Sequence, residues 1–303
     1  MPSNRSNPKL PKAKTEPGAT ISFEAIGTQW SIELYDVDHF PAQLKAMILA
    51  RIELFDKDYS RFREDSLVTK MSKQAGMYLL PDDAKPLFDL YKELYEMSKG
   101  SVTPLIGQTL ADAGYDAAYS LQSKPLVRPP AWDDVLSYDF PNLTFSKPAL
   151  LDVGALGKGY LVDIIGELLE TQGRGAYCID AGGDMRHRQG SQTLQVGLEH
   201  PTQAELAIGV ASIANESICG SAGNRRTWGD YHHIIDPATL QSPRHIAAVW
   251  VIADSTLLAD ALTTALFFMS PQALAKRYTF KYALVRSDYS LEHSADFPAN
   301  FFN

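Results

Sequence analysis

The segment Asp152-Val-Gly-Ala-Leu-Gly-Lys-Gly159 combines a carboxylate, a lysine and three glycines within eight residues. Glycines let the backbone approach a ligand closely, and the N–H groups that begin a helix attract anions such as phosphate. The spacing matches neither a P-loop, which needs four residues between its first glycine and the Gly-Lys pair, nor the GxGxxG pattern. The residues alone therefore indicate either an anion site or a tight turn between a strand and a helix.

Asp260 and Thr264 lie four residues apart in an otherwise apolar stretch, 259–266. If the stretch is helical, both side chains share one face. A carboxylate and a hydroxyl are hard oxygen ligands that suit Mg²⁺, and an unpaired charge in an apolar helix is costly. The alternative is that Thr264 bonds the backbone carbonyl of Asp260 and the carboxylate is simply solvated.

Two further segments carry titratable side chains beside turn-forming residues. His232-His233-Ile-Ile-Asp236-Pro237 contains imidazoles, which titrate near neutral pH and can act as a base or a ligand. Its proline favours an extended Asp236. Asp180-Ala-Gly-Gly-Asp184 ends a predicted strand, and its paired glycines indicate a turn or close backbone packing. Each segment is also compatible with a purely structural turn.

The elements that must position these residues follow from the hydrophobic periodicity. Alternation over 21–35 predicts two strands hinged at Gly27-Thr28. Further strands are predicted at 149–153, 176–180, 193–199, 206–212, 217–219, 246–253 and 281–286. Helices are predicted at 41–57, 83–98, 159–172, 257–269 and 271–278, with a polar, turn-prone segment over 58–76 and with loops and short helices over 100–148. Because the strands after residue 175 follow one another without helices, we expect antiparallel or mixed sheets with flanking helices and assign the α+β class.

Composition excludes several classes of function. The 303 residues carry 28 Lys and Arg against 36 Asp and Glu, a formal net charge of −8, which argues against a protein that binds nucleic-acid phosphates. Cys178 and Cys219 are isolated, which argues against a thiolate zinc site or a redox pair. They are two buried thiols or, in an exported protein, one disulfide.

Residues 1–20 are rich in Lys, Pro, Ser and Asn and predict a disordered leader. The leader lacks the apolar region of a secretory signal, and the longest nearly uncharged stretch, 255–270, is too short to span a membrane. We therefore expect no membrane segment and a cytoplasmic location, or a periplasmic one if a targeting segment is missing from the sequence.

Taken in chain order, these motifs resemble the ApbE family, the FAD:protein FMN transferases. The matching segments are Gly27-Thr28, Ser60-Arg-Phe62 with Ser66, 152–163, 180–184, 233–237 and 259–265. The resemblance implies an ApbE-like, T-fold-related single catalytic unit over 21–303. It also implies that, with Mg²⁺, the FMN moiety of FAD is transferred to a Thr or Ser hydroxyl of an acceptor protein and AMP is released. FAD and that acceptor protein are the implied partners.

The resemblance assigns roles to individual residues. It implies that the Ala155 carbonyl, Asp260 and Thr264 hold the metal, and that His233 is the general base. Contacts to FAD are implied at Ile26, Phe62, Ser101, Val102, Thr103, Asp152, Lys158 and Ile235. For the flat rings of FAD, Phe62, Trp30 and Tyr115 are candidate aromatic faces.

The chain departs from the family pattern at three places. Ser101-Val102-Thr103 stands where Ala-Phe-Asp is common, Ser221-Ala222-Gly223 replaces Thr-Ser-Gly, and Leu240 replaces a glycine. Two alternative functions follow: a Mg²⁺-dependent FAD pyrophosphatase that yields FMN and AMP, or a non-enzymatic FAD-binding protein. The loss of the aromatic ring and the carboxylate at 102–103 favours the second alternative.

Overall fold

The structure is a computed structural model that describes residues 18–190, 192–224 and 226–302, without the side chain of residue 204. Residues 1–17 of the predicted leader, 1–20, lie outside the described residues. Ala19 and Thr20 already belong to the first strand, so the ordered chain begins earlier than the predicted boundary.

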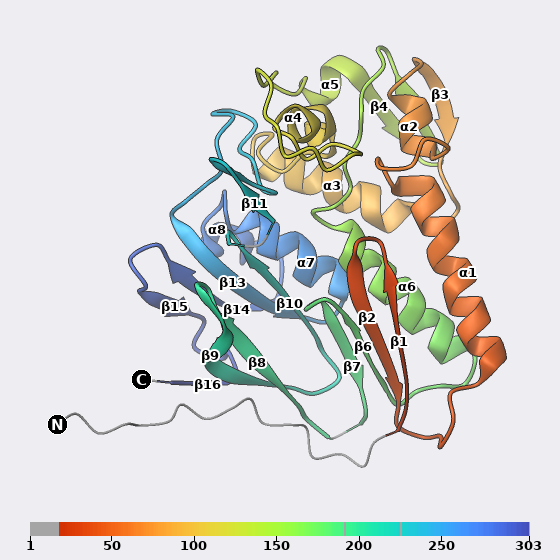
Figure 1. Ribbon diagram of the computed structural model, residues 1–303, viewed down its shortest axis with the longest axis vertical. Coiled ribbons are helices and arrows are strands. Elements are labelled where there is room, and N and C mark those ends of the chain that lie inside the picture. The colour runs from red at the N-terminus through yellow and green to blue at the C-terminus, as the bar shows by residue number, and fades with distance from the viewer. Residues whose placement is uncertain (1–17, 191, 225, 303) are drawn as a thin grey trace.

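An antiparallel sheet of eight strands forms the centre of the molecule (Figure 1), in the order β1-β2-β6-β7-β10-β13-β14-β15. Its strands are β1 Ala19–Ala25, β2 Thr28–Leu34, β6 Tyr177–Ala181, β7 Met185–Arg188, β10 Ser217–Ala222, β13 Ile246–Ala253, β14 Lys281–Arg286 and β15 Leu291–His293. Every neighbouring pair runs antiparallel. The α+β prediction is confirmed, in its antiparallel form.

Three smaller antiparallel sheets accompany the central one. They are formed by β8 Leu194–His200, β9 Gln203–Ile213 and β16 Ala299–Phe301; by β3 Gly76–Leu79, β4 Leu136–Asp139 and β5 Asn142–Phe145; and by β11 Thr227–Trp228 with β12 Tyr231–His232. The helices are α1 Ala42–Tyr59, α2 Leu67–Met71, α3 Lys85–Met97, the 3₁₀ turn η1 Pro104–Ile106, α4 Gly107–Asp112, α5 Trp132–Val135, α6 Gly157–Thr171, α7 Thr256–Ala265 and α8 Pro271–Leu274.

Both faces of the central sheet are covered. On β13, Val249 and Val251 belong to the core shared with α6 and α7, whereas Trp250 and Ile252 belong to a second core with β8, β9 and β16. Because successive side chains of a strand point to opposite faces, a strand buried on both faces is apolar throughout. This burial explains the uninterrupted apolar sequence of β13.

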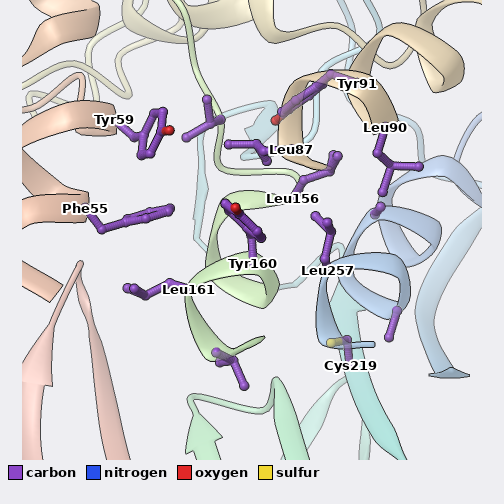
Figure 2. Close-up of a cluster of buried hydrophobic side chains, with 14 of the residues drawn as sticks. Phe55, Tyr59, Leu87, Leu90, Tyr91, Leu156, Tyr160, Leu161, Cys219 and Leu257 are labelled. Atoms are coloured by element: carbon purple, nitrogen blue, oxygen red, sulfur yellow. The ribbon is translucent and has the colours of Figure 1, made fainter. Parts of the chain in front are cut away.

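Helices α6 and α7 pack against each other and against the sheet, and α1 packs on the outer side of α6. Figure 2 shows the core between them, where Phe55 and Tyr59 of α1 lie near Tyr160 and Leu161 of α6. Cys219 lies at the far side of this cluster, and both cysteines are free and buried. Among the described residues, no helix combines the length and the apolar character needed to cross a membrane.

Several short elements differ from the prediction. The expected strand at 149–153 is wrong, because the amides of Ala149 and Asp152 bond to the carbonyls of Met71, at the end of α2, and Pro104, at the start of η1, rather than to a neighbouring strand. The prediction also missed β3, β4, β5, β7, β11, β12, β15, β16 and α2, each of which has only two to five residues. Segments this short contain too few residues to establish a period.

Candidate active site

A cavity of about 620 Å³ lies where the tip of the β1–β2 hairpin, the end of α1, the start of α6 and the inner face of α7 meet. Loops from the α3–α4 region and from around 226 and 233–235 complete its wall. All twelve residues predicted from the sequence line this one cavity: Ile26, Phe62, Ser101, Val102, Thr103, Asp152, Ala155, Lys158, His233, Ile235, Asp260 and Thr264. Their individual roles stay predictions.

The glycine-rich segment is a tight turn that leads into α6. The carboxylate of Asp152 accepts a hydrogen bond from the Gly154 N–H at 2.7 Å, and the Gly157 N–H donates to the Val153 carbonyl, also at 2.7 Å. The other Asp152 oxygen is paired with the Arg61 guanidinium at 2.5 Å. The segment is thus a structural turn, and it also places the N-terminal turn of α6 at the cavity wall.

Lys158 is the cation of the cavity that stands nearest to two buried carboxylates. Its ammonium lies 2.9 Å from Oδ2 of Asp184, a carboxylate that is fully buried. Burial acts to lower the pKa of Lys158, but Asp184 and Asp260 act against it, and the net shift is upward. The lysine therefore stays positively charged at neutral pH.

Asp260 sits on α7, where it packs against α6. Its Oδ2 accepts a hydrogen bond from the Gly159 N–H at 2.8 Å. Burial, followed by the charge of Asp184, raises the pKa of Asp260 well above its ordinary value, while Lys158 and this N–H oppose the rise. Two buried carboxylates thus share one lysine, an arrangement that a bound cation would stabilise by offsetting the excess negative charge.

The residues predicted to bind Mg²⁺ line one part of the cavity and would offer it oxygen ligands. The Thr264 hydroxyl lies 3.5 Å from the Ala155 carbonyl oxygen, and both residues line the cavity with Asp260. Within 18–190, 192–224 and 226–302, no group of three or more His, Cys, Asp and Glu could hold a metal. The donor set is instead one carboxylate, one hydroxyl and one carbonyl, all hard oxygens, which fits Mg²⁺.

The two neighbouring histidines have different surroundings. His233 lines the cavity, whereas His232 is buried behind it. The Nδ1 of His232 accepts the Ile234 N–H at 3.2 Å and its Nε2 lies 3.0 Å from the Pro243 carbonyl, which requires a neutral ring with the proton on Nε2. Burial correspondingly lowers the pKa of His232. Asp236 does not line the cavity and closes a turn through the Ala238 N–H.

The segment 101–103 both lines the cavity and shapes the backbone. The Ser98 hydroxyl accepts the Val102 N–H at 2.9 Å, and the Thr103 hydroxyl accepts the Leu105 N–H at 3.2 Å at the start of η1. The prediction that Trp30 offers an aromatic face to the ligand is wrong. Trp30 is 1% exposed, belongs to the core and does not line the cavity, because β2 turns it toward the helices.

Four further residues of the site had no predicted role: Arg61, Tyr119 and Arg226, which line the cavity, and Asp184, which is paired with Lys158. Arg61 lies over the rings of Phe62 and Tyr115, with its Cζ 4.2 and 4.9 Å from their centroids. Arg226 donates to the Tyr115 hydroxyl at 3.0 Å. Arg61 and Asp184 stand inside recognised motifs, so a search for buried charges within those motifs could have found them.

The sequence profile of the ApbE family matches residues 26–283, which is most of the chain. The chain belongs to the ApbE family.

Two curated relatives carry the name FAD:protein FMN transferase. The one from Klebsiella pneumoniae (strain 342) is 24% identical over 86% of this chain and 81% of its own length. The one from Haemophilus influenzae is 24% identical over 89% and 87%.

Solved structures show the same fold. The flavin transferase ApbE from Vibrio cholerae superposes with a TM-score of 0.76 at 18% identity and covers 93% of this chain and 99% of its own. The ApbE protein from Thermotoga maritima gives a TM-score of 0.80 at 20% identity, over 91% and 96%. At these identities the structural likeness supports the fold alone, and the activity is argued below from the site.

Proposed function

We propose that this protein transfers the FMN moiety of FAD to a Thr or Ser hydroxyl of an acceptor protein, in a Mg²⁺-dependent reaction that releases AMP. The observation that carries the proposal is the arrangement around Lys158. The charged ammonium of Lys158 and the buried carboxylate of Asp260 line the same cavity as the other predicted residues, and a second buried carboxylate, Asp184, is paired with this ammonium. The names of the relatives, FAD:protein FMN transferase, support the same activity.

The chemistry that these residues can perform is phosphoryl transfer, which depends mainly on positioning and on neutralising charge. Asp260, Thr264 and the Ala155 carbonyl would hold Mg²⁺, which supplies positive charge to the pyrophosphate. Lys158 binds a phosphate oxygen from the adjacent wall. The acceptor hydroxyl attacks the phosphorus of the FMN half, the bond to the AMP half breaks, AMP leaves with the bridging oxygen, and His233 takes the hydroxyl proton.

The test is to incubate the full-length protein with FAD and MgCl₂, with and without total protein from the source cells as a pool of acceptors. AMP and free FMN are measured by chromatography, and protein-bound flavin by fluorescence after denaturing electrophoresis. The transferase predicts AMP release matched by protein-bound flavin. Free FMN formed at the same rate without acceptor indicates the pyrophosphatase instead. FAD that remains intact indicates a binding protein.

His233→Ala tests the assignment of the general base. Removal of a general base lowers the rate of a proton-coupled step by about 10²–10⁴-fold, so we expect flavin transfer to fall by that factor. The affinity for FAD, measured by flavin fluorescence, should change little, because the proton is taken from the acceptor. His232→Ala is the adjacent comparison, and it should lower stability instead. Unchanged transfer by His233→Ala at neutral pH would contradict the role.

A further inference from the structure

Three aromatic rings form a small box in the cavity wall. The rings of Phe62 and Tyr119 are stacked nearly parallel, with centroids 5.2 Å apart and an angle of 10° between the planes. Tyr115 stands edge-on to both, 5.4 Å from each centroid and at 69° to Phe62 and 79° to Tyr119. All three residues line the cavity. Phe62 and Tyr119 are therefore two facing walls, and Tyr115 closes one end between them.

Tyr119 is held in this place at a cost in free energy. Its φ of 49° is left-handed, a region that side chains other than glycine seldom adopt, and its side chain remains 51% exposed. The local backbone is built to keep it there: the Asp116 carboxylate accepts the N–H groups of Ala118 and Ser120, each at 3.0 Å.

The position of Tyr119 relates it to the mouth of the cavity. Its hydroxyl oxygen lies 3.7 Å from the point that a Cβ would occupy on Gly27, at the tip of the β1–β2 hairpin. The tyrosine thus reaches from the loop after α4 across to the hairpin. Arg226 approaches the same place, with one guanidinium nitrogen 3.5 Å from the Gly27 carbonyl. Any large ligand that enters at this point has to pass Tyr119.

We propose that Tyr119 and Phe62 form an aromatic clamp that grips a flat ring of FAD, with Tyr119 as the movable outer jaw. This inference rests on the proposed function, because it takes FAD as the ligand. With centroids 5.2 Å apart, the rings of Phe62 and Tyr119 pack directly on each other, so a third flat ring enters between them only when Tyr119 moves away from Phe62. The exposed side of Tyr119 leaves it room to swing outward.

The clamp is tested by Tyr119→Ala, with Tyr119→Phe as the conservative variant. Stacking of a base on an aromatic side chain contributes about 1–3 kcal/mol, so the dissociation constant for FAD should rise by about 5- to 150-fold in Tyr119→Ala and by less than about threefold in Tyr119→Phe. Tyr289→Ala is a matched control. The backbone of Tyr289 is also in the left-handed region, with φ 65°, and the residue is 61% exposed, but it does not line the cavity.

Binding is measured by flavin fluorescence for FAD and FMN, and by calorimetry for AMP. A loss of affinity for FMN but not AMP identifies the isoalloxazine as the clamped ring, and the reverse pattern identifies the adenine. Alanine keeps a Cβ at the left-handed position and loses the ring contacts with Phe62 and Tyr115, so the melting temperature of Tyr119→Ala should fall slightly, and binding is compared at a temperature where both proteins are folded. If wild type binds FAD and Tyr119→Ala binds it equally well or more tightly, the clamp is wrong. If wild type binds no FAD, the proposed function itself fails.

Discussion

Ile26 shows how strain within one residue can serve a binding site. It precedes Gly27 in the two-residue turn between β1 and β2, and both residues have positive φ, 44° and 72°. A β-branched residue is unusual in this conformation, which costs about 1–2 kcal/mol for an L-residue with a Cβ. Asparagine followed by glycine suits the same turn far better. Since Ile26 lines the cavity, we infer that its apolar side chain is retained for the ligand.

Ile26→Asn should therefore separate stability from binding. Relief of the left-handed strain offsets the lost burial of a half-exposed side chain, so the free energy of unfolding should change by less than about 1 kcal/mol. The affinity for FAD should fall by about 5- to 10-fold, because an apolar contact becomes polar. Urea unfolding and flavin fluorescence measure the two quantities.

Ile21→Asn is the matched substitution on the same hairpin. Ile21 is also half-buried, but it pairs with Ile32 in regular strand geometry and does not line the cavity. This variant should lose about 1–2 kcal/mol of stability and keep its affinity for FAD. If Ile26→Asn loses as much stability as Ile21→Asn does, strain is not a significant factor in the turn.

Helices α6 and α7 show which elements could be predicted and which could not. Apolar periodicity predicts a helix that contains Asp260 and another that begins at Gly159, and both helices exist; α6 begins two residues earlier and so includes Lys158. The sequence carried no sign that Gly159 brings these helices into contact, because a helix–helix crossing depends on which residues face each other in space. Strands of three or four residues, such as β7 and β15, escaped prediction because they are stabilised by their partners rather than by their own pattern.

Gly159→Ala tests the contact between these two helices. A Cβ at this position would meet the Thr256 carbonyl oxygen at 2.3 Å and the Asp260 Cβ at 2.6 Å, so α7 would have to shift. We expect a loss of about 1–3 kcal/mol of stability, together with at least a tenfold drop in FAD-dependent AMP release because Asp260 is displaced. Denaturation and chromatography of AMP check the two effects.

The comparison for this substitution is Gly209→Ala in β9. A Cβ there would meet the Asn300 carbonyl oxygen at 2.8 Å, but neither residue lines the cavity. This variant should lose stability. At a temperature where both variants are folded, it should release AMP at the wild-type rate. Equal activity of the two variants would show that the crossing does not position Asp260.

Positively charged side chains gather at the cavity although the molecule as a whole is acidic. The chain has a formal net charge of −8, yet Arg61, Lys158 and Arg226 converge on one cavity from segments far apart in the sequence. The family resemblance predicted twelve residues of this cavity, eight of them within motifs that are continuous in sequence. Tyr119 and Arg226 stand in irregular loops without a motif, and only the folded chain brings them to the site.

A buried histidine also links the stability of the whole fold to pH. His187 on β7 is 1% exposed, and burial lowers its pKa below the ordinary value of 6.5. In the interval between the lowered pKa and 6.5, the unfolded chain holds a proton that the folded chain does not. The stabilising contribution of His187 is therefore complete above about pH 6.5 and is lost as the pH falls through the folded-state pKa, with a slope of up to about 1.4 kcal/mol per pH unit.

His187→Phe isolates this contribution. The substitution keeps an aromatic ring beside Tyr35, whose centroid lies 5.9 Å from that of His187, and removes the titrating group. Carboxylates such as Asp260 titrate in both proteins, so their effect cancels when wild type and variant are compared. Wild type should lose more unfolding free energy than the variant between pH 7.5 and 5.5, by about 1 kcal/mol in urea denaturation. Parallel pH profiles for the two proteins would mean that burial leaves the proton affinity of His187 unchanged.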